Sequence, residues 1–266
     1  MSISSTVLDR ADIRFYTAAP ALQPHVGCFW VITADAGATM RIVPDGTTSI
    51  AIKRWENRGP AAYLRGPTVR PTELRFDEPT TLIGVRLRPG VVFNLTGVGA
   101  YTLVNRSIEL RDHESLCAID SIDPLPQTSV EWIDALQALL IAKLEGTRIH
   151  PLVEKALAEI QAEQGNLSIP ELAARCGSSE RNLSRLMRDW IGYGPKRYAG
   201  IVRFQSTLAQ MERVPALPIA ALAMETGYFD QSHLTADVAR YAGATPGRLI
   251  SESAADFAKT YCDVPY

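Results

Sequence analysis

The C-terminal half of the chain contains the same pattern twice. "IPELAARCGSSERNLSRLM" occupies residues 169–187, and "IAALAMETGYFDQSHLTAD" occupies residues 219–237. Six positions recur in the same order, with one residue inserted midway: Ile169, Leu172, Gly177, Leu183, Gly192 and Pro195 correspond to Ile219, Leu222, Gly227, Leu234, Gly243 and Pro246. This ordered recurrence indicates a duplicated structural unit.

Each copy predicts two short helices joined by a tight glycine turn. In the first copy, Ser168 and Glu171 form an S-x-x-E capping box that would begin a helix, and Gly177 would end it. Ser179 is placed to cap a second helix, whose Leu183 and Leu186 would face the core. This arrangement is typical of a helix-turn-helix unit.

The segment between the copies predicts one long helix. Residues 195–213 contain no internal helix breaker, and a helix of about 18 residues is about 27 Å long at roughly 1.5 Å per residue. That is close to the helical turn of DNA, about 34 Å, which separates successive major-groove faces. We therefore expect two recognition helices on one rigid spacer, so that a single chain can enter two adjacent major grooves of double-stranded DNA.

Charge is distributed unevenly along the chain. The net charge of −2 and the pI near 6.1 do not suggest nucleic-acid binding for the whole protein. Residues 175–213, however, contain eight basic and three acidic residues, a net of +5, whereas residues 214–266 contain three basic and six acidic, a net of −3. A whole-chain sum conceals such a local field, and we expect the basic surface to be confined to the first copy.

Residues from about 150 to 250 resemble the DNA-binding domain of AraC-type transcriptional regulators. The resemblance lies in the paired units, the spacer and the phrases "SSERNLSRLMRDWIGYGPKRY" and "ETGYFDQSHL". It implies base contacts from early positions of the two recognition helices: Arg181, Asn182, Ser184 and Arg185 in the first, and Gln231, Ser232, His233 and Thr235 in the second. Arginine at such positions binds guanine through two hydrogen bonds, worth about 1–3 kcal/mol of discrimination.

Phosphate contacts are expected from other basic side chains, which position a protein without specifying sequence. These are Arg188, Lys196, Arg197 and Arg203. The alternative for all these cations is an ordinary solvated or salt-bridged helix surface.

The second unit departs from the family pattern. Ala236 stands where the family commonly has arginine, Val238 stands where phenylalanine is common, and Asp237 adds an acid between them. With fewer cations to release counterions from DNA, this unit is expected to dock weakly or to use mainly polar contacts. A metal-binding or pH-sensing role for His233 is a weaker alternative to a polar DNA contact.

The N-terminal half has the composition of a β-rich domain. Short apolar runs are separated by turns such as Pro44-Asp45-Gly46, and "IDSIDPLPQTS" at residues 119–129 resembles a linker. We predict an α+β chain: a mainly β effector-type domain at 1–120, a linker and connecting helix at 121–149, an all-α domain with two helix-turn-helix units at 150–253, and a tail at 254–266. The apolar face of the helix at residues 130–145 would pack within the chain or pair across a dimer axis, and we favour the first.

The β-rich half offers candidates for effector binding. Several aromatic residues would line an apolar pocket or simply form the core: Phe29, Trp30, Trp55, Tyr63, Phe76, Phe93 and Tyr101. Asp45 and Arg41 would bind a polar ligand, unless Asp45 bonds to its own turn as such residues usually do. Cys28 is expected to be buried rather than to sense redox state.

Nothing in the sequence indicates catalysis. His25, His113, His150 and His233 are dispersed, and the four cysteines (Cys28, Cys117, Cys176 and Cys262) form no C-x-x-C pair. Nucleophile-elbow, dinucleotide-binding and P-loop motifs are absent. We therefore expect no catalytic residue, cofactor or metal.

The sequence thus predicts a cytoplasmic, effector-responsive, sequence-specific DNA-binding regulator without a membrane span or leader segment. Its expected partners are double-stranded DNA and a small-molecule effector, with a homodimer as an open alternative and RNA polymerase as a partner in the case of an activator. Two other functions stay open: a helical interaction module that has lost DNA binding, and an enzyme with an appended DNA-binding domain.

Overall fold

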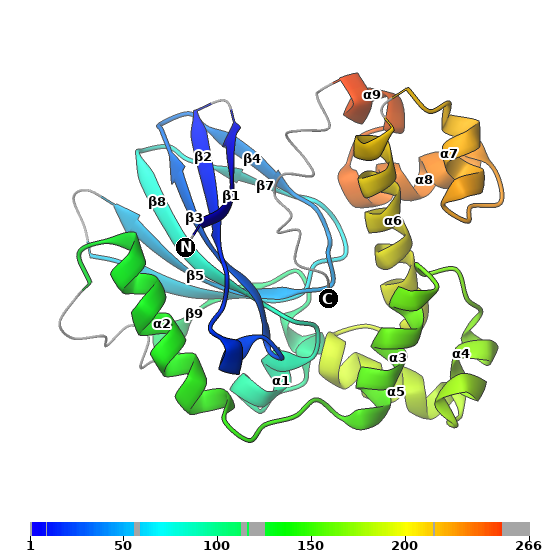
Figure 1. Cartoon of the computed structure of the whole chain (residues 1–266), viewed down its shortest axis with the longest axis horizontal. Coiled ribbons are helices and arrows are strands. Elements are labelled where there is room, and N and C mark those ends of the chain that lie inside the picture. The colour runs from blue at the N-terminus through cyan, green and yellow to red at the C-terminus, as the bar shows by residue number, and fades with distance from the viewer. Residues whose placement is uncertain are drawn as a thin grey trace.

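The computed structural model describes residues 2–8, 10–55, 59–112, 116, 126–214 and 216–251. Outside this part lie most of the predicted linker (119–125), the predicted tail (254–266), and His113, Cys117 and Cys262. Figure 1 shows a β-rich N-terminal half beside a helical C-terminal half. The predicted α+β fold class is therefore confirmed.

The N-terminal half is built on an antiparallel sheet. Its strands are β1 (Ser2–Leu8), β2 (Ala11–Tyr16), β3 (Val26–Ala34), β5 (Thr48–Trp55), β6 (Ala61–Arg65), β8 (Thr80–Leu87) and β9 (Ser107–Glu109), with β4 (Thr39–Ile42) and β7 (Thr72–Arg75) as a separate pair. The order in the larger sheet is β1-β2-β3-β8-β5-β6-β9. The predicted turn before β5 is present, with Gly46 at φ +79°, a conformation that glycine adopts without a Cβ clash.

Apolar side chains point to both faces of the sheet and form two apolar layers. One face contributes Phe29, Val31, Ile50 and Ile52 to a core completed by helices, and the other contributes Ile13 and its neighbours to a core shared with β4 and β7. Because successive side chains of a strand point to opposite faces, both layers follow from the same strands.

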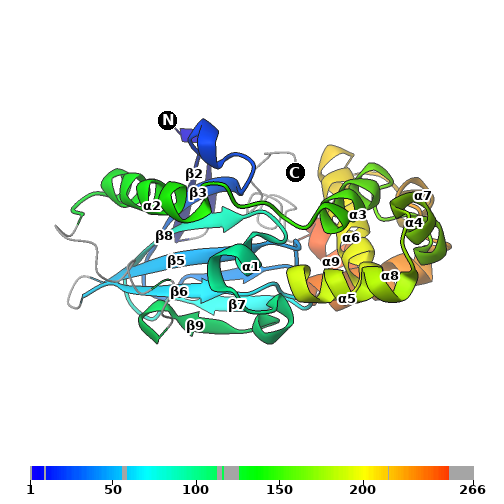
Figure 2. The same ribbon diagram turned by 90° about the horizontal axis from the view of Figure 1, so that it is seen from below.

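Two helices cover the first face of the sheet. These are α1 (Val91–Thr96) and α2 (Ser129–Leu144), and Figure 2 shows α2 lying along the sheet near β8. Trp132, Leu136 and Leu140 of α2 are buried in the core of the β-rich half. Thr128 and Glu131 form a capping box at its start. The apolar face of α2 is thus used within the chain.

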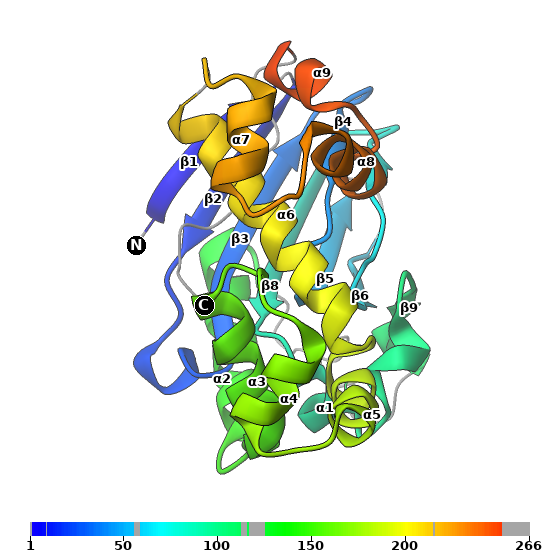
Figure 3. The same ribbon diagram turned by 90° about the vertical axis from the view of Figure 1, so that its right-hand side faces the viewer.

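The C-terminal half is helical, with the two predicted pairs of short helices and the long helix predicted between them. Its helices are α3 (Pro151–Ala162), α4 (Ile169–Cys176), α5 (Glu180–Ile191), α6 (Pro195–Arg213), α7 (Ile219–Glu225), α8 (Gln231–Ala242) and α9 (Pro246–Ser251). The spacer helix α6 has 19 residues, about 28 Å at roughly 1.5 Å per residue. Figure 3 shows it running from the α4–α5 pair to the α7–α8 pair.

The two helix-turn-helix units share their local geometry. Gly177 and Gly227 follow the first helix of each unit with φ of +66° and +77°, and Leu183 and Leu234 of the second helices are both fully buried. The duplication deduced from the sequence is therefore also a duplication of structure.

The two halves are packed against each other. Phe93 of α1 stacks on Trp190 of α5 with ring centroids 4.4 Å apart, and Val43 of the β-rich half belongs to the core of the helical half. Arg41 donates to the carbonyl oxygen of Ala242 at the end of α8, at 3.5 Å. Both recognition helices are thus in contact with the β-rich half.

Candidate nucleic-acid interface and effector cavity

The first recognition helix, α5, has its apolar side in the core and its polar side in solvent. Ser179 caps it by accepting from the Asn182 backbone N–H at 3.2 Å, which satisfies one unpaired donor of the first turn. Leu183 is fully buried and Leu186 is nearly so, while Arg181 and Arg185 are exposed. The orientation predicted for this helix is confirmed.

The polar side chains of α5 are engaged in local bonds. Arg185 donates to the Asn182 side-chain oxygen at 3.1 Å and pairs with Asp189 at 3.4 Å, and Asn182 donates to Ser178 Oγ at 3.1 Å. Since the Arg185 side chain is 62% exposed, such pairs contribute only about 0.2–1 kcal/mol. Arg185 can exchange them for a base edge at little cost.

The second recognition helix, α8, presents polar side chains at its first positions. Asp230 caps it by accepting from the His233 backbone N–H at 2.8 Å. Gln231, Ser232 and His233 are exposed and Thr235 is partly exposed. The His233 ring meets the Tyr228 ring edge-on, with centroids 5.1 Å apart, so its position is fixed by an aromatic contact.

Asp237 lies on the buried side of α8. Only 6% of the residue is exposed, and its carboxylate pairs with Arg203 of α6 and Arg240 of α8, each at 3.4 Å. The acid that Asp237 adds to the second unit is therefore turned inward, because its carboxylate pairs with Arg203 of α6. Arg203 also lies over the Tyr228 ring at 4.7 Å, and it is the least exposed of the predicted phosphate-binding residues.

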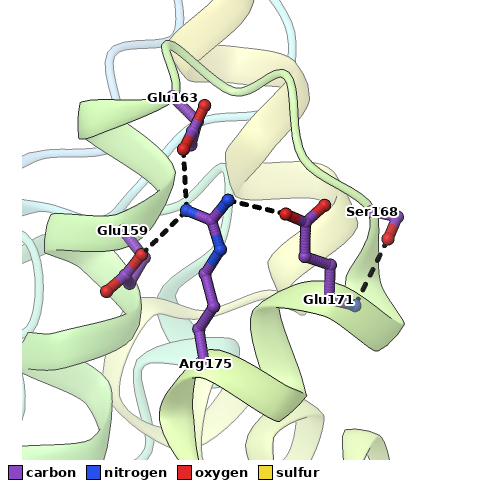
Figure 4. A network of polar contacts seen from close by, with 5 residues as sticks. All are labelled: Glu159, Glu163, Ser168, Glu171 and Arg175. Atoms are coloured by element: carbon purple, nitrogen blue, oxygen red, sulfur yellow. Dashed lines mark hydrogen bonds and ion pairs between the residues drawn. The ribbon is translucent and has the colours of Figure 1, made fainter.

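Arg175 is held in a network of carboxylates. It contacts Glu159 at 3.2 Å, Glu163 at 2.7 Å and Glu171 at 2.6 Å (Figure 4). These hydrogen bonds raise the pKa of Arg175 and tie α4 to α3. Arg175 therefore adds nothing to the basic surface counted from the sequence.

The same network alters the predicted start of α4. Ser168 accepts from the Glu171 backbone N–H at 3.2 Å, as a capping serine does. The Glu171 carboxylate, however, pairs with Arg175. Only the serine half of the predicted capping box is observed.

A shared hollow joins the two recognition helices. It has a volume of about 560 Å³ and is bordered by Ser184 of α5, His233 of α8 and the exposed cations Lys196 and Arg197 at the start of α6. In Figure 3, α5 and α8 are both seen nearly end-on at the two ends of α6. Both recognition helices therefore border the same side of the spacer.

The β-rich half approaches this surface at η2 (Ala100–Leu103). Tyr101 of η2 lies under the Arg188 guanidinium at 5.1 Å and borders a small depression with Ser184 and Arg185. This contact could not be predicted from the sequence, because it joins residues from different halves of the fold.

A cavity of about 360 Å³ lies inside the β-rich half, within the range of roughly 300–1,000 Å³ typical of small-molecule sites. Four of the aromatic residues proposed for a pocket line it: Trp30, Trp55, Tyr63 and Phe76. The others lie elsewhere: Phe29 is in the core on the opposite face of the sheet, and Phe93 and Tyr101 contact the helical half. Cys28 is buried as expected.

Three charged side chains that line this cavity, Asp45, Arg65 and Arg86, lie close together. Asp45 accepts from the Thr47 backbone N–H at 2.9 Å, as a turn aspartate does, and its second oxygen lies 3.6 Å from Arg86 Nε. Arg65, from the neighbouring strand β6, is the other cation; burial lowers its pKa, and Asp45 opposes that change. Arg41 is directed to Ala242 instead. Arg65 and Arg86 were not singled out from the sequence, although both lie at cavity-facing positions of strands.

Two further features, a metal-binding cluster and a membrane-spanning helix, are absent from the described part of the chain. No group of three or more His, Cys, Asp or Glu residues there is placed to hold a metal ion. None of the helices described is both long and apolar enough to cross a membrane.

Comparison with known families gives two matches. Residues 172–251 match a helix-turn-helix domain, and residues 14–109 match a domain of unknown function, DUF6597. The C-terminal part of the chain is therefore a helix-turn-helix domain, of the AraC type that its sequence resembles. No curated protein matches the chain.

Structures of ToxT from Vibrio cholerae are similar at a low level. A ToxT structure at 1.65 Å has 9% identity and a TM-score of 0.47, covering 84% of this chain and 97% of ToxT. Another, of wild-type ToxT with a bound unsaturated fatty acid, has 11% identity and a TM-score of 0.45, covering 94% and 96%. At these values the likeness transfers neither a ligand nor a mechanism to this chain.

Proposed function

We propose that the protein is a sequence-specific DNA-binding transcriptional regulator whose N-terminal half responds to a small-molecule effector. The observation that supports DNA binding most strongly is the position of Ser184 and His233 on one hollow beside Lys196 and Arg197. Two recognition helices on the same side of a stiff spacer suit two successive major grooves. In this proposal Arg181, Asn182, Ser184 and Arg185 contact bases from the first helix, and Gln231, Ser232, His233 and Thr235 do so from the second.

Phosphate binding is assigned to the exposed cations. Arg188, Lys196 and Arg197 are exposed at the rim of the two recognition helices. Arg203 pairs with the buried Asp237, so it is a weaker candidate for phosphate binding than the other three. The second unit contributes fewer phosphate contacts than the first, so its share of the affinity depends less on salt.

Effector binding is supported by the apolar, aromatic-lined cavity of the β-rich half and by the contacts of this half with the helical half. Two further proposals concern partners. The protein forms a homodimer, and, in the case of an activator, it contacts RNA polymerase at the promoter.

Fluorescence anisotropy tests the DNA-binding part. Genomic fragments captured by the protein supply the operator, and affinity is measured from about 50 to 200 mM salt. We expect a steep fall in affinity with salt and a loss of at least tenfold for Arg181→Ala with Arg185→Ala. An unchanged affinity in this double variant would favour the interaction module, which the exposed Met224 and Phe229 of the second unit would also suit.

A further inference from the structure

The charges of three neighbouring side chains that line the effector cavity do not balance. Arg65 and Arg86 both line it, whereas Asp45 is the single acid among the described residues of the lining. The side chains of Arg86 and Asp45, which pair at 3.6 Å, are 16% and 15% exposed. In the described part of the chain, Nη2 of Arg65 is buried without a hydrogen-bond acceptor. Burying a guanidinium donor without an acceptor costs free energy, and a bound anion would offset this cost.

The other two cations of the cavity are already accommodated. Lys53 lies over the Trp55 ring at 4.8 Å. Arg75 is 74% exposed and pairs with Glu73 at 2.7 Å. The unmet requirement is therefore for a hydrogen-bond acceptor at Arg65, since Asp45 already pairs with Arg86.

The remainder of the cavity is apolar and rich in rings. Phe15, Trp30, Phe76 and Leu82 line its body, and these side chains favour a flat aromatic group through stacked or edge-on contacts. A ligand that meets both requirements has an aromatic body and one anionic group.

We propose that the cavity binds an aromatic monocarboxylate, with its carboxylate on Arg65 and Arg86 and its ring system between Trp30 and Phe76. A guanidinium group matches a carboxylate through two parallel hydrogen bonds. A phosphate monoester, with nearly two charges at neutral pH, is repelled by Asp45 more strongly than a monocarboxylate is.

The anion site is connected to the spacer helix by the loop at residues 43–47. Val43 packs in the core of the helical half, and the carbonyl oxygen of Pro44 accepts a hydrogen bond from Gln205 of α6. Gly46 lies so close to Tyr198 of α6 that a Cβ there would be 2.7 Å from the ring. A ligand carboxylate competes with Asp45 for Arg86, and this competition loosens the loop that holds α6. This regulatory consequence rests on the proposed function, whereas binding itself does not.

Calorimetry on the full chain tests the ligand class. The probes are 2-naphthoate, the neutral 2-naphthamide and 2-naphthyl phosphate. We expect 2-naphthoate to bind at least tenfold more tightly than either of the others. Equal binding of the amide would overturn the anion site, and tighter binding of the phosphate would overturn the carboxylate.

Matched variants test the residues. Arg65→Gln is expected to lose at least tenfold in affinity for 2-naphthoate but not for 2-naphthamide. The control Arg14→Gln, at an exposed arginine of β2 that does not line the cavity, is expected to stay within twofold of the wild type. Because Arg65→Gln can also impair folding, Asp45→Asn provides a second test. It removes the competing anion and is expected to raise 2-naphthoate affinity at least threefold. Unchanged or weaker binding in Asp45→Asn would contradict the proposal.

Anisotropy on captured DNA separates this inference from the proposed function. Saturating 2-naphthoate is expected to change DNA affinity at least threefold in the wild type. Binding of 2-naphthoate without such a change would refute the link through the loop and leave DNA binding standing. Absence of DNA binding with or without ligand would refute the regulator and leave the cavity assignment standing.

Discussion

At the scale of single residues, the structure separates cations that are free to meet DNA from cations that are already neutralised. Arg175 sits among three glutamates, and Arg203 pairs with the buried Asp237. Arg181, Lys196 and Arg197 are exposed. A count of basic residues along the sequence therefore overstates the field of the first unit.

The salt dependence of binding should report this difference. Replacing Arg197 by glutamine removes one phosphate contact and should reduce the slope of log affinity against log salt by about 1. Arg175→Gln should leave the slope unchanged, because its charge is already offset by carboxylates. The measurement is anisotropy over a salt series, and equal slopes for the two variants would contradict the assignment.

Asp237 should matter for stability. Asp237→Asn leaves the mostly buried Arg203 without its counter-charge, and breaking such a pair costs about 3 kcal/mol of unfolding free energy. The control is Asp189→Asn, whose partner Arg185 is exposed, with an expected cost of about 0.5 kcal/mol or less. Urea unfolding measures both, and a small loss in both variants would show that Asp237 is not a structural charge.

At the scale of elements, the helices follow local signals closely. Caps at Ser168 and Ser179, stops at Gly177 and Gly165, and the unbroken spacer could all be predicted, because each depends on residues within one or two turns. The strands and the turn at residue 46 could also be predicted from alternation and turn chemistry.

Contacts between distant segments were the part that could not be predicted. The inward position of Asp237 depends on Arg203, which is 34 residues away. The Glu171 side chain is diverted to a network that includes Glu159 of α3 and Glu163, the residue that follows α3. The anion site joins Arg65, Arg86 and Asp45 only after the strands have paired. Periodicity gives the face on which a side chain lies, but it does not give the partner that it meets there.

The junction of α3 with α6 offers a test at this scale. Gly165 has φ +78°, and a Cβ there would overlap the carbonyl oxygen of Ala199 in α6. Gly177 also has a positive φ but has open space around it. We expect Gly165→Ala to destabilise the protein by roughly 3 kcal/mol or more, and Gly177→Ala by about 1–2 kcal/mol from the backbone alone. Denaturant unfolding that gives equal losses would contradict the close packing of α3 on α6.

At the scale of the whole molecule, the β-rich half contacts both ends of the DNA-binding domain. It holds α5 through Phe93 and Tyr101, α6 through the loop at residues 43–47, and the end of α8 through Arg41. A change in the cavity can therefore act on both recognition helices at once.

Tyr101 should restrain DNA binding. Its ring makes a cation–π contact with the Arg188 guanidinium, and such a contact stabilises by about 0.5–1 kcal/mol at an exposed site. Tyr101→Ala should free Arg188 for phosphate and raise DNA affinity about two- to fivefold. Val98→Ala is the control, since Val98 is similarly exposed and lies nearby in the chain. Anisotropy that shows no gain, or a loss, for Tyr101→Ala would refute this restraint.

The most direct measurement is protection of guanine N7 from methylation in an operator bound by one chain, which detects contacts in the major groove. Two recognition helices on one spacer predict two protected patches on the same face of the duplex, centred about 10 base pairs apart, with the weaker protection under α8. A single patch, or two patches on opposite faces, would contradict the account.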